Sequence, residues 1–233
     1  MKKIIIAIDG YSSTGKSTLA SMLSNYLNYR HINTGSMYRA ITLYALRNKW
    51  IIDLGTKSSV NRDAIIRAAD LINLEFKFDH DNICKMYMNS EDVDDKLKSP
   101  LVSKYVSQIS VYPLLRKKIV KKQQSIGRSK GVVMEGRDIG SVVFPNAELK
   151  LFITASIKVR AQRRYQELMS LGVKTKLSDV LHNLEMRDSS DSNRKDSPLY
   201  QVNDAILIDN TSLTIDEQFN TVIELLNSEK NLL

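Results

Sequence analysis

The chain has 233 residues, of which 42% are hydrophobic and 26% are charged, and its formal net charge is +8. This length suffices for one large domain or for a core with an insert, and the composition is that of an ordinary globular protein. No stretch approaches the roughly 20 apolar residues that a membrane span needs, and the single cysteine excludes an intrachain disulfide, so we expect a cytoplasmic protein without membrane contact.

The first expected element is a buried strand, because five apolar residues run from position 4 to position 8. This run follows two lysines, but Asp9 interrupts it and no small-residue cleavage site follows, so a secretory signal is not expected. A glycine-containing turn comes next, and apolar residues then recur at helical spacing between Leu19 and Leu27. A short strand near 31–33 precedes a second helix, whose apolar stripe is Met37, Ala40, Ile41 and Tyr44.

The middle of the chain, about 60–128, changes character and is interpreted as an α+β insert. We expect a helix over 60–71, a hairpin with its turn at 79–82, and two helices near 101–109 and 113–126. Strand patterns at 131–135, 148–154 and 206–209 then alternate with helical patterns, and the last helix carries a capping box at Thr214 and Glu217. This alternation predicts an α/β fold with a parallel sheet covered on both faces.

Residues 10–17, GYSSTGKS, match the pattern GxxxxGK[ST] between an expected strand and an expected helix. Glycines let successive backbone N–H groups turn towards phosphate oxygens, and the helix that follows adds its positive N-terminal end. In this pattern the lysine reaches the β and γ phosphates and the serine ligates Mg²⁺. The sequence therefore predicts a nucleoside-triphosphate site, with Ser17 on the metal, at Gly10, Tyr11, Ser12, Ser13, Thr14, Gly15, Lys16, Ser17 and Thr18.

This loop alone does not identify the reaction, because GTPases, ATPases and small-molecule kinases share it. The guanine-reading pattern N-K-x-D of GTPases is absent, since Trp50 and Ile51 follow Asn48 and Lys49. Arginines beside hydroxyl, carboxylate or aromatic groups mark four other stretches, at 34–39, 107–116, 135–145 and 187–194. The acceptor of the phosphoryl group is to be sought there.

Two of these stretches carry a more specific expectation, and the first is expected near the phosphate loop. Arg137 and Asp138 follow a strand end, which is where ligands bind in open α/β sheets. Arg187 and Asp188 continue the apolar face of a helix, so they are expected to point into a cleft or towards a partner. In the stretch 34–39, Tyr38 falls off the apolar stripe and is free to face a cleft.

Two further features leave alternatives open. Arg160, Arg163 and Arg164 share one face of the helix after the strand at 148–154. They form either a solvated basic face or a mobile lid that stabilises charge on a transferred phosphoryl group. Asp9, at a strand end, is either a site residue or a carboxylate that caps N–H groups of its own turn.

In order and spacing, the blocks TGSMYRA (34–40), EGRDIGSVVFP (135–145) and RD-x-x-D-x-x-R (187–194) resemble the bacterial cytidylate kinase family of P-loop nucleoside monophosphate kinases, and the resemblance covers nearly the whole chain. It implies a P-loop core with a five-stranded parallel sheet at 1–59 and 129–233, a monophosphate-binding insert at 60–128 and a helical, arginine-bearing lid at about 156–170. It also implies transfer of the γ-phosphoryl group of ATP to CMP or dCMP, with Mg²⁺, in pyrimidine nucleotide metabolism.

The resemblance further implies roles for individual residues. Those implied to contact the monophosphate are Ser107, Arg116 and Asp138 at the cytosine ring, Arg39, Arg137 and Arg194 at the phosphate, Arg187 and Asp191 at the sugar, and Thr34 and Tyr38 elsewhere in the pocket. Those implied to assist transfer are Lys16, Arg137, Arg160, Arg163 and Arg164. The chain departs from the family pattern at Asn33, Lys98, Glu135 and Ser190. These departures put the fine substrate specificity in doubt more than the type of reaction.

Two other functions compete with this interpretation. A related kinase would phosphorylate another acceptor, such as UMP. A nucleic-acid-binding ATPase would account for the net charge of +8, but the sequence has no basic run interleaved with aromatic residues. We therefore expect small-molecule substrates, no nucleic-acid partner and a monomer.

Overall fold

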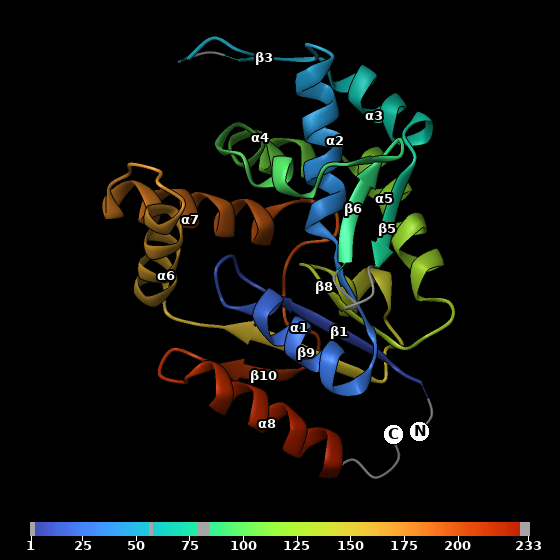
Figure 1. Ribbon diagram of the computed structural model, residues 1–233, viewed down its shortest axis with the longest axis vertical. Helices are drawn as coiled ribbons and strands as arrows, with labels where there is room; N and C mark the ends of the chain where they lie inside the picture. The colour runs from blue at the N-terminus through green and yellow to red at the C-terminus, as the bar shows by residue number, and fades with distance from the viewer. Residues whose placement is uncertain (1–2, 56–57, 79–83, 229–233) are drawn as a thin grey trace. The chain divides into compact units, whose positions relative to one another are not determined.

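The computed structural model describes residues 3–55, 58–78 and 84–228 (Figure 1). By its contacts the chain forms two compact units, and we refer to residues 1–31 with 129–233 as the first unit and to residues 32–128 as the second unit. The domain boundary that the sequence places at residue 59 stays a prediction.

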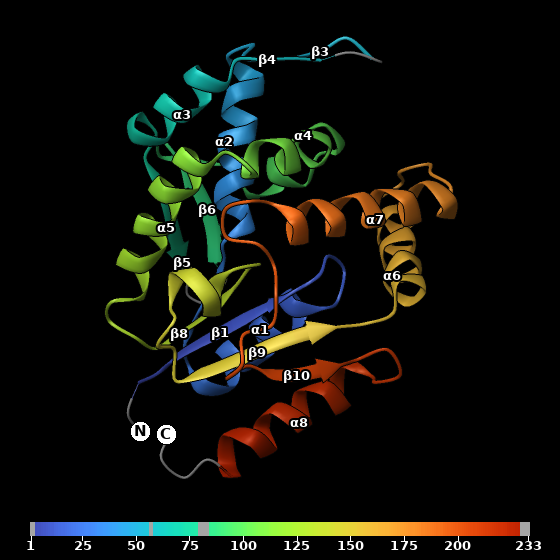
Figure 2. The same cartoon turned by 180° about the vertical axis from the view of Figure 1, so that it is seen from behind.

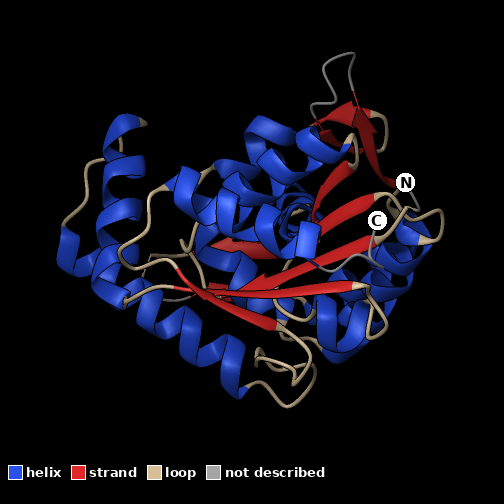
Figure 3. Cartoon of the chain, turned by 90° about the horizontal axis from the view of Figure 1, so that it is seen from below, coloured by secondary structure: helices blue, strands red, loops and turns tan. Residues whose placement is uncertain are grey.

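The first unit is built on a five-stranded sheet in the order β10–β9–β1–β8–β2, whose strands lie side by side in Figure 3. The strands are β1 (Ile5–Gly10), β2 (Arg30–Asn33), β8 (Val132–Glu135), β9 (Leu149–Thr154) and β10 (Ile206–Asp209). β1 pairs in parallel with β8 and β9, and β10 pairs in parallel with β9. The expected α/β fold with a parallel sheet is thereby confirmed.

Helices complete the first unit on either side of these strands: α1 (Lys16–Leu27), α6 (Ile157–Ser170), α7 (Leu177–Asn193) and α8 (Ile215–Ser228). Ile6 and Ile8 of β1, with Ile4 just before it, are fully buried in one cluster with apolar residues of α1 and α8. α6 continues from β9 and packs against α7 through a smaller cluster (Figure 2). α8 begins with the expected capping box, in which the N–H of Glu217 donates to Thr214 Oγ1 over 3.2 Å.

The second unit is α+β. Its helices are α2 (Gly35–Arg47), α3 (Arg62–Leu71), α4 (Pro100–Ser110) and α5 (Pro113–Gly127), with a 3₁₀ turn at Asp94–Lys98. Its strands are β5 (Leu74–Phe78), β6 (Cys84–Met88) and β7 (Glu91–Asp92) in one antiparallel sheet, and β3 (Ile51–Asp53) and β4 (Ser58–Val60) in another. The turn predicted at 79–82 lies outside the described residues.

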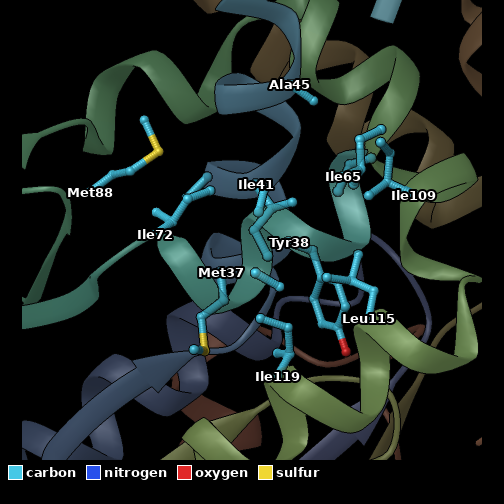
Figure 4. Packing of buried hydrophobic residues seen from close by; sticks show 14 of the residues in the cluster. Met37, Tyr38, Ile41, Ala45, Ile65, Ile72, Met88, Ile109, Leu115 and Ile119 are labelled. Carbon is cyan, nitrogen blue, oxygen red and sulfur yellow. The ribbon is translucent and has the colours of Figure 1, made fainter. Parts of the chain in front are cut away.

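The core of the second unit forms around α2. Met37, Ile41 and Ala45 recur along this helix at a spacing of four and are almost completely buried. In Figure 4 they lie among Ile65 of α3 and Ile72 just after it, with residues of β6, α4 and α5 around them. Burying one such isoleucine or leucine side chain contributes about 1.5–3 kcal/mol, so this cluster stabilises the second unit from within.

Candidate functional site

The phosphate loop joins β1 to α1, and two of its glycines cannot be replaced without strain. Gly10 has φ 143°, and a Cβ atom there would lie 2.0 Å from the carbonyl oxygen of Ile153 in β9. Gly15 has φ 83°, in the left-handed region that glycine adopts most readily. This backbone conformation suits a loop whose N–H groups bind phosphate oxygens. The helix α1 starts at the end of the loop, at Lys16.

Lys16 is buried inside this loop. Its Nζ donates hydrogen bonds to the carbonyl oxygen of Tyr11 and, over 3.2 Å, to Thr14 Oγ1. Burial, followed by the positive charge of Arg137, holds the pKa of Lys16 well below its usual value, although Glu135 acts in the opposite direction. An anion that enters the loop stabilises the protonated form of Lys16, because it supplies a full negative charge where the carbonyl oxygens carry only partial ones.

Ser17 contacts a carboxylate from the neighbouring strand. Its Oγ donates to Glu135 Oε2 over 2.9 Å, and the other oxygen, Oε1, lies 2.9 Å from His31 Nε2. Glu135 ends β8 and pairs with Ile8 of β1, so the sheet brings the two groups together. The sequence pattern gave no role to Glu135, because its contact with Ser17 spans 118 residues.

These oxygen atoms are compatible with the Mg²⁺ that the sequence predicts. A hydroxyl and a carboxylate are ligands that Mg²⁺ prefers, and the ion is usually bound by only one or two protein groups together with substrate phosphates. Within the described part of the chain, no group of three or more His, Cys, Asp or Glu residues could hold a metal on its own. Ser17 and Glu135 therefore fit a magnesium ion that arrives with its nucleotide.

Arg137 connects the phosphate loop to two distant motifs. Its Nη2 donates to Ser12 Oγ over 2.8 Å, and its Nε donates to Asp191 Oδ2 over 2.9 Å. Arg194 Nη1 lies 3.5 Å from Asp191 Oδ1, and Arg194 Nη2 lies 3.8 Å from Asp138 Oδ1. The stretch 135–145, which the sequence placed near the phosphate loop, and the stretch 187–194, which it placed only at a cleft or partner, thus meet at the loop within the first unit.

Asp191, on α7, is the charge around which these arginines gather. Burial alone would raise its pKa, but the guanidinium groups of Arg137 and Arg194 and the hydrogen bond from Arg137 outweigh burial and lower it. Asp191 is therefore a carboxylate with three cationic neighbours, the third being Arg187, and is suited to accept further hydrogen bonds.

The three arginines of α6 have three different environments. Arg160 is buried, donates to the carbonyl oxygens of Ala155 and Ser12, and forms an ion pair with Asp188 on α7. Arg163 donates to Asn210 through both terminal nitrogens, and Arg164 pairs with Glu167 one turn further along α6. A solvated basic face is therefore wrong for Arg160, while a mobile lid stays a prediction.

Asp9 caps no turn of its own. Its two carboxylate oxygens accept the N–H groups of Ile139 and Gly140, over 2.8 and 2.7 Å, at the start of a π-helical turn, Ile139–Val143. Burial raises the pKa of Asp9 to about 6, although these two hydrogen bonds oppose the rise. Asp9 thus fixes the segment that directly follows Arg137 and Asp138.

Five of the remaining predicted residues belong to the second unit, whereas Arg187 lies on α7 in the first unit. Arg39 Nη1 donates to Ser103 Oγ over 3.0 Å, and Arg116 Nη1 donates to the carbonyl oxygen of Ser110 over 3.1 Å. Arg116 also lies 5.5 Å from the ring centre of Tyr38. The expectation that Tyr38 lies off the apolar stripe is wrong, because its side chain is 8% exposed and packs in the core around α2 (Figure 4), while its place in the monophosphate pocket stays a prediction. Ser107, at the C-terminal end of α4, and the buried Thr34 complete this set.

Comparisons with known proteins agree with the arrangement of the motifs. The family model described as cytidylate kinase matches residues 6–228. The chain is 48% identical to the cytidylate kinase of Flavobacterium psychrophilum, over 98% of this chain and 100% of that protein. It is 49% identical to that of Flavobacterium johnsoniae, over 97% of both chains. Its fold is similar to that of an uncharacterised protein from Eubacterium ventriosum, at a TM-score of 0.50 and 12% identity over 98% of this chain and 100% of the other.

Proposed function

Because the chain belongs to the cytidylate kinase family, we propose that it transfers the γ-phosphoryl group of ATP to CMP or dCMP, giving ADP and CDP or dCDP. One structural observation carries this proposal. Arg137 donates hydrogen bonds to Ser12 of the phosphate loop and to Asp191 of the stretch 187–194. One guanidinium therefore joins the loop proposed to bind ATP to a residue proposed to bind the monophosphate. This arrangement suits an enzyme that brings two phosphate-bearing substrates together.

Transfer between two polyanions requires charge neutralisation and alignment more than a general base, since the attacking phosphate oxygen is already anionic. We assign this task to Lys16 and Arg137, with Arg160, Arg163 and Arg164 of α6. Ser17 and Glu135 would hold Mg²⁺, which supplies positive charge to the β and γ phosphate oxygens of ATP. Lys16 then contributes the fixed charge at the base of the loop.

On the acceptor side, we assign nine residues to the monophosphate: Thr34, Tyr38, Arg39, Ser107, Arg116, Asp138, Arg187, Asp191 and Arg194. Asp191 supports the assignment best, because its lowered pKa keeps it an acceptor for sugar hydroxyl groups. Its Oδ1 is only loosely held by Arg194, at 3.5 Å, and this oxygen is suited to the sugar.

Three finer assignments belong to the same proposal. We assign residues 60–128 to monophosphate binding and the helix at about 156–170 to a lid that closes over the phosphates and keeps water out. We assign the protein to the cytoplasm as a monomer that acts on small molecules and not on nucleic acid. No helix of the described chain is long and apolar enough to span a bilayer.

A steady-state assay with ATP, Mg²⁺ and a series of acceptors tests the proposal. We expect kcat/KM for CMP and dCMP to exceed that for UMP and AMP. A preference for UMP or AMP over CMP would refute the cytidine assignment, and it would leave a P-loop kinase with another acceptor. A parallel salt series of DNA and RNA binding is expected to give no affinity at moderate salt, whereas tight binding with a steep salt dependence would favour a nucleic-acid-binding ATPase.

A further inference from the structure

Asn210, which no sequence motif singled out, lies at the centre of a buried hydrogen-bond network in the first unit. It follows β10 directly and is 1% exposed. Its backbone N–H donates to the carbonyl oxygen of Thr154 over 2.9 Å, which fixes its main chain to the end of β9. Its side chain contacts two parts of the proposed site, the phosphate loop and Arg163.

The amide nitrogen of Asn210 contacts the phosphate loop. Nδ2 donates to the carbonyl oxygen of Thr14 over 2.6 Å and to Gln218 Oε1, on α8, over 2.9 Å. In a trans peptide the carbonyl and the following N–H point in opposite directions. Asn210 holds the Thr14 carbonyl towards the end of β10. The Gly15 N–H, which belongs to the same peptide, therefore points away from β10.

This peptide needs an external partner because its second residue is glycine. Gly15, at φ 83°, lacks the side chain that would restrict its backbone. The peptide that follows is already fixed, since the Gly15 carbonyl oxygen accepts the N–H of Leu19 in the first turn of α1. The orientation of the Thr14–Gly15 peptide is thus the part of the loop that depends on Asn210.

The oxygen atoms of the same residue hold Arg163. Asn210 Oδ1 accepts from Arg163 Nη1 over 2.9 Å, and the backbone oxygen of Asn210 accepts from Nη2 over 3.0 Å. One buried side chain therefore joins the loop through its donor end and α6 through its acceptor end. The two ends are chemically distinct, so a substitution can remove one and keep the other.

We propose that Asn210 is a positioning residue that aims the Gly15 N–H at the phosphates of ATP while it anchors Arg163 beside the same loop. This inference rests on the proposed function only in that ATP occupies the phosphate loop, and it does not depend on which acceptor the enzyme uses. The Asn210 side chain acts through Thr14 and Arg163 and contacts no reacting atom.

Asn210→Asp separates the two ends, because it keeps the size of the side chain and an acceptor for Arg163. It replaces the donor to Thr14 with an oxygen that repels the carbonyl. We expect the affinity for ATP, measured by calorimetry, to fall about tenfold, and the affinity for CMP to stay within about twofold of the wild type. Asn220→Asp, at an exposed position of α8, makes the same change of charge outside the network and is expected to leave both affinities unchanged.

A second measurement examines the loop without nucleotide. The amide resonance of Gly15 in a ¹H–¹⁵N spectrum is expected to shift in Asn210→Asp and to stay in place in Asn220→Asp. If Asn210→Asp does not fold, Asn210→Ala replaces it, with the same expected difference between ATP and CMP. The proposal is overturned if ATP binding is unchanged, if ATP and CMP binding weaken equally, or if the Gly15 resonance does not move. A wrong acceptor assignment would show in the acceptor assay alone.

Discussion

The guanidinium of the buried Arg160 and the carboxylate of the half-buried Asp188 form an ion pair, with Nη1 and Oδ2 2.5 Å apart, although 28 residues separate them in the chain. Arg160 also donates to the carbonyl oxygen of Ser12, so the first turn of α6 is tied both to α7 and to the phosphate loop. A buried charge of this kind depends on its partner, because the protein interior cannot replace the water that it has lost.

Asp188→Ala is expected to lower the free energy of unfolding by about 3 kcal/mol, since it leaves the Arg160 guanidinium buried without its carboxylate. Urea denaturation measures this quantity. Glu167→Ala is the matched control, because it removes the more exposed partner of Arg164 on the same helix and is expected to cost less than about 1 kcal/mol. Equal losses in the two variants would contradict a structural role for the Arg160–Asp188 pair.

Binding of ATP is expected to take up a proton at alkaline pH. Burial lowers the pKa of Lys16, so part of the population is neutral there, and bound phosphates raise that pKa again. Calorimetry in buffers of different ionisation enthalpy measures the uptake, and at alkaline pH the γ-phosphate of free ATP no longer titrates. Lys16→Met is expected to abolish both the uptake and most of the turnover, whereas proton release on binding would show that Lys16 is not the group that titrates.

Asp191→Asn is expected to raise KM for CMP about tenfold and to leave KM for ATP nearly unchanged. The carboxamide is a poorer acceptor for sugar hydroxyl groups and no longer neutralises Arg137 and Arg194. Asp179→Asn, at an exposed position in the first turn of the same helix, serves as control. A comparable rise in both KM values would mean that Asp191 stabilises the phosphate loop and does not bind the monophosphate.

Asp9 is expected to make stability depend on pH between about 4 and 6. Its folded pKa, about 6, lies above the usual 3.8, so the folded state binds the proton more tightly than the unfolded state. The resulting stabilisation is present below about pH 4 and is lost as the pH rises through 6, with a magnitude on the order of 3 kcal/mol. The difference in unfolding free energy between wild type and Asp9→Asn should therefore shrink over this range, and a constant difference would contradict the prediction.

Glu135→Gln is expected to raise the Mg²⁺ concentration that gives half-maximal activity by about tenfold. The substitution removes the negative charge that faces Ser17 Oγ, while excess Mg²⁺ restores turnover. Glu185→Gln, exposed on α7, removes the same charge away from the loop and is expected to leave the Mg²⁺ dependence unchanged. An unchanged Mg²⁺ dependence in Glu135→Gln would exclude Glu135 from the metal site.

The features that were predictable from the sequence are those with a local signature. The phosphate loop is set by a pattern of eight residues, and the order of buried strands predicted the α/β fold. β3 and β4 were not predicted, because strands of three residues with little buried surface leave no apolar alternation. The π-helical turn at Ile139–Val143 was not predicted either, since it depends on Asp9, 130 residues away.

The predictions for single site residues divide in the same way. Arg137 could be placed because it follows a strand end, a position that topology alone brings to the loop. Asn210 could not, because its bond to the Thr14 carbonyl spans 196 residues and requires the folded sheet. Tyr38 was misplaced because helical spacing defines a stripe, whereas the core of the second unit surrounds α2 more widely than one stripe.

The close approach of Gly10 to Ile153 has a consequence for how the enzyme meets its nucleotide. Because β9 leaves no room for a side chain at position 10, the start of the loop takes its shape from the strand beside it and has it before any ligand arrives. Little conformational entropy is then lost on association, so ATP is captured by a site that is already formed. Encounter by diffusion, and not rearrangement of the loop, should set the rate at which the donor binds.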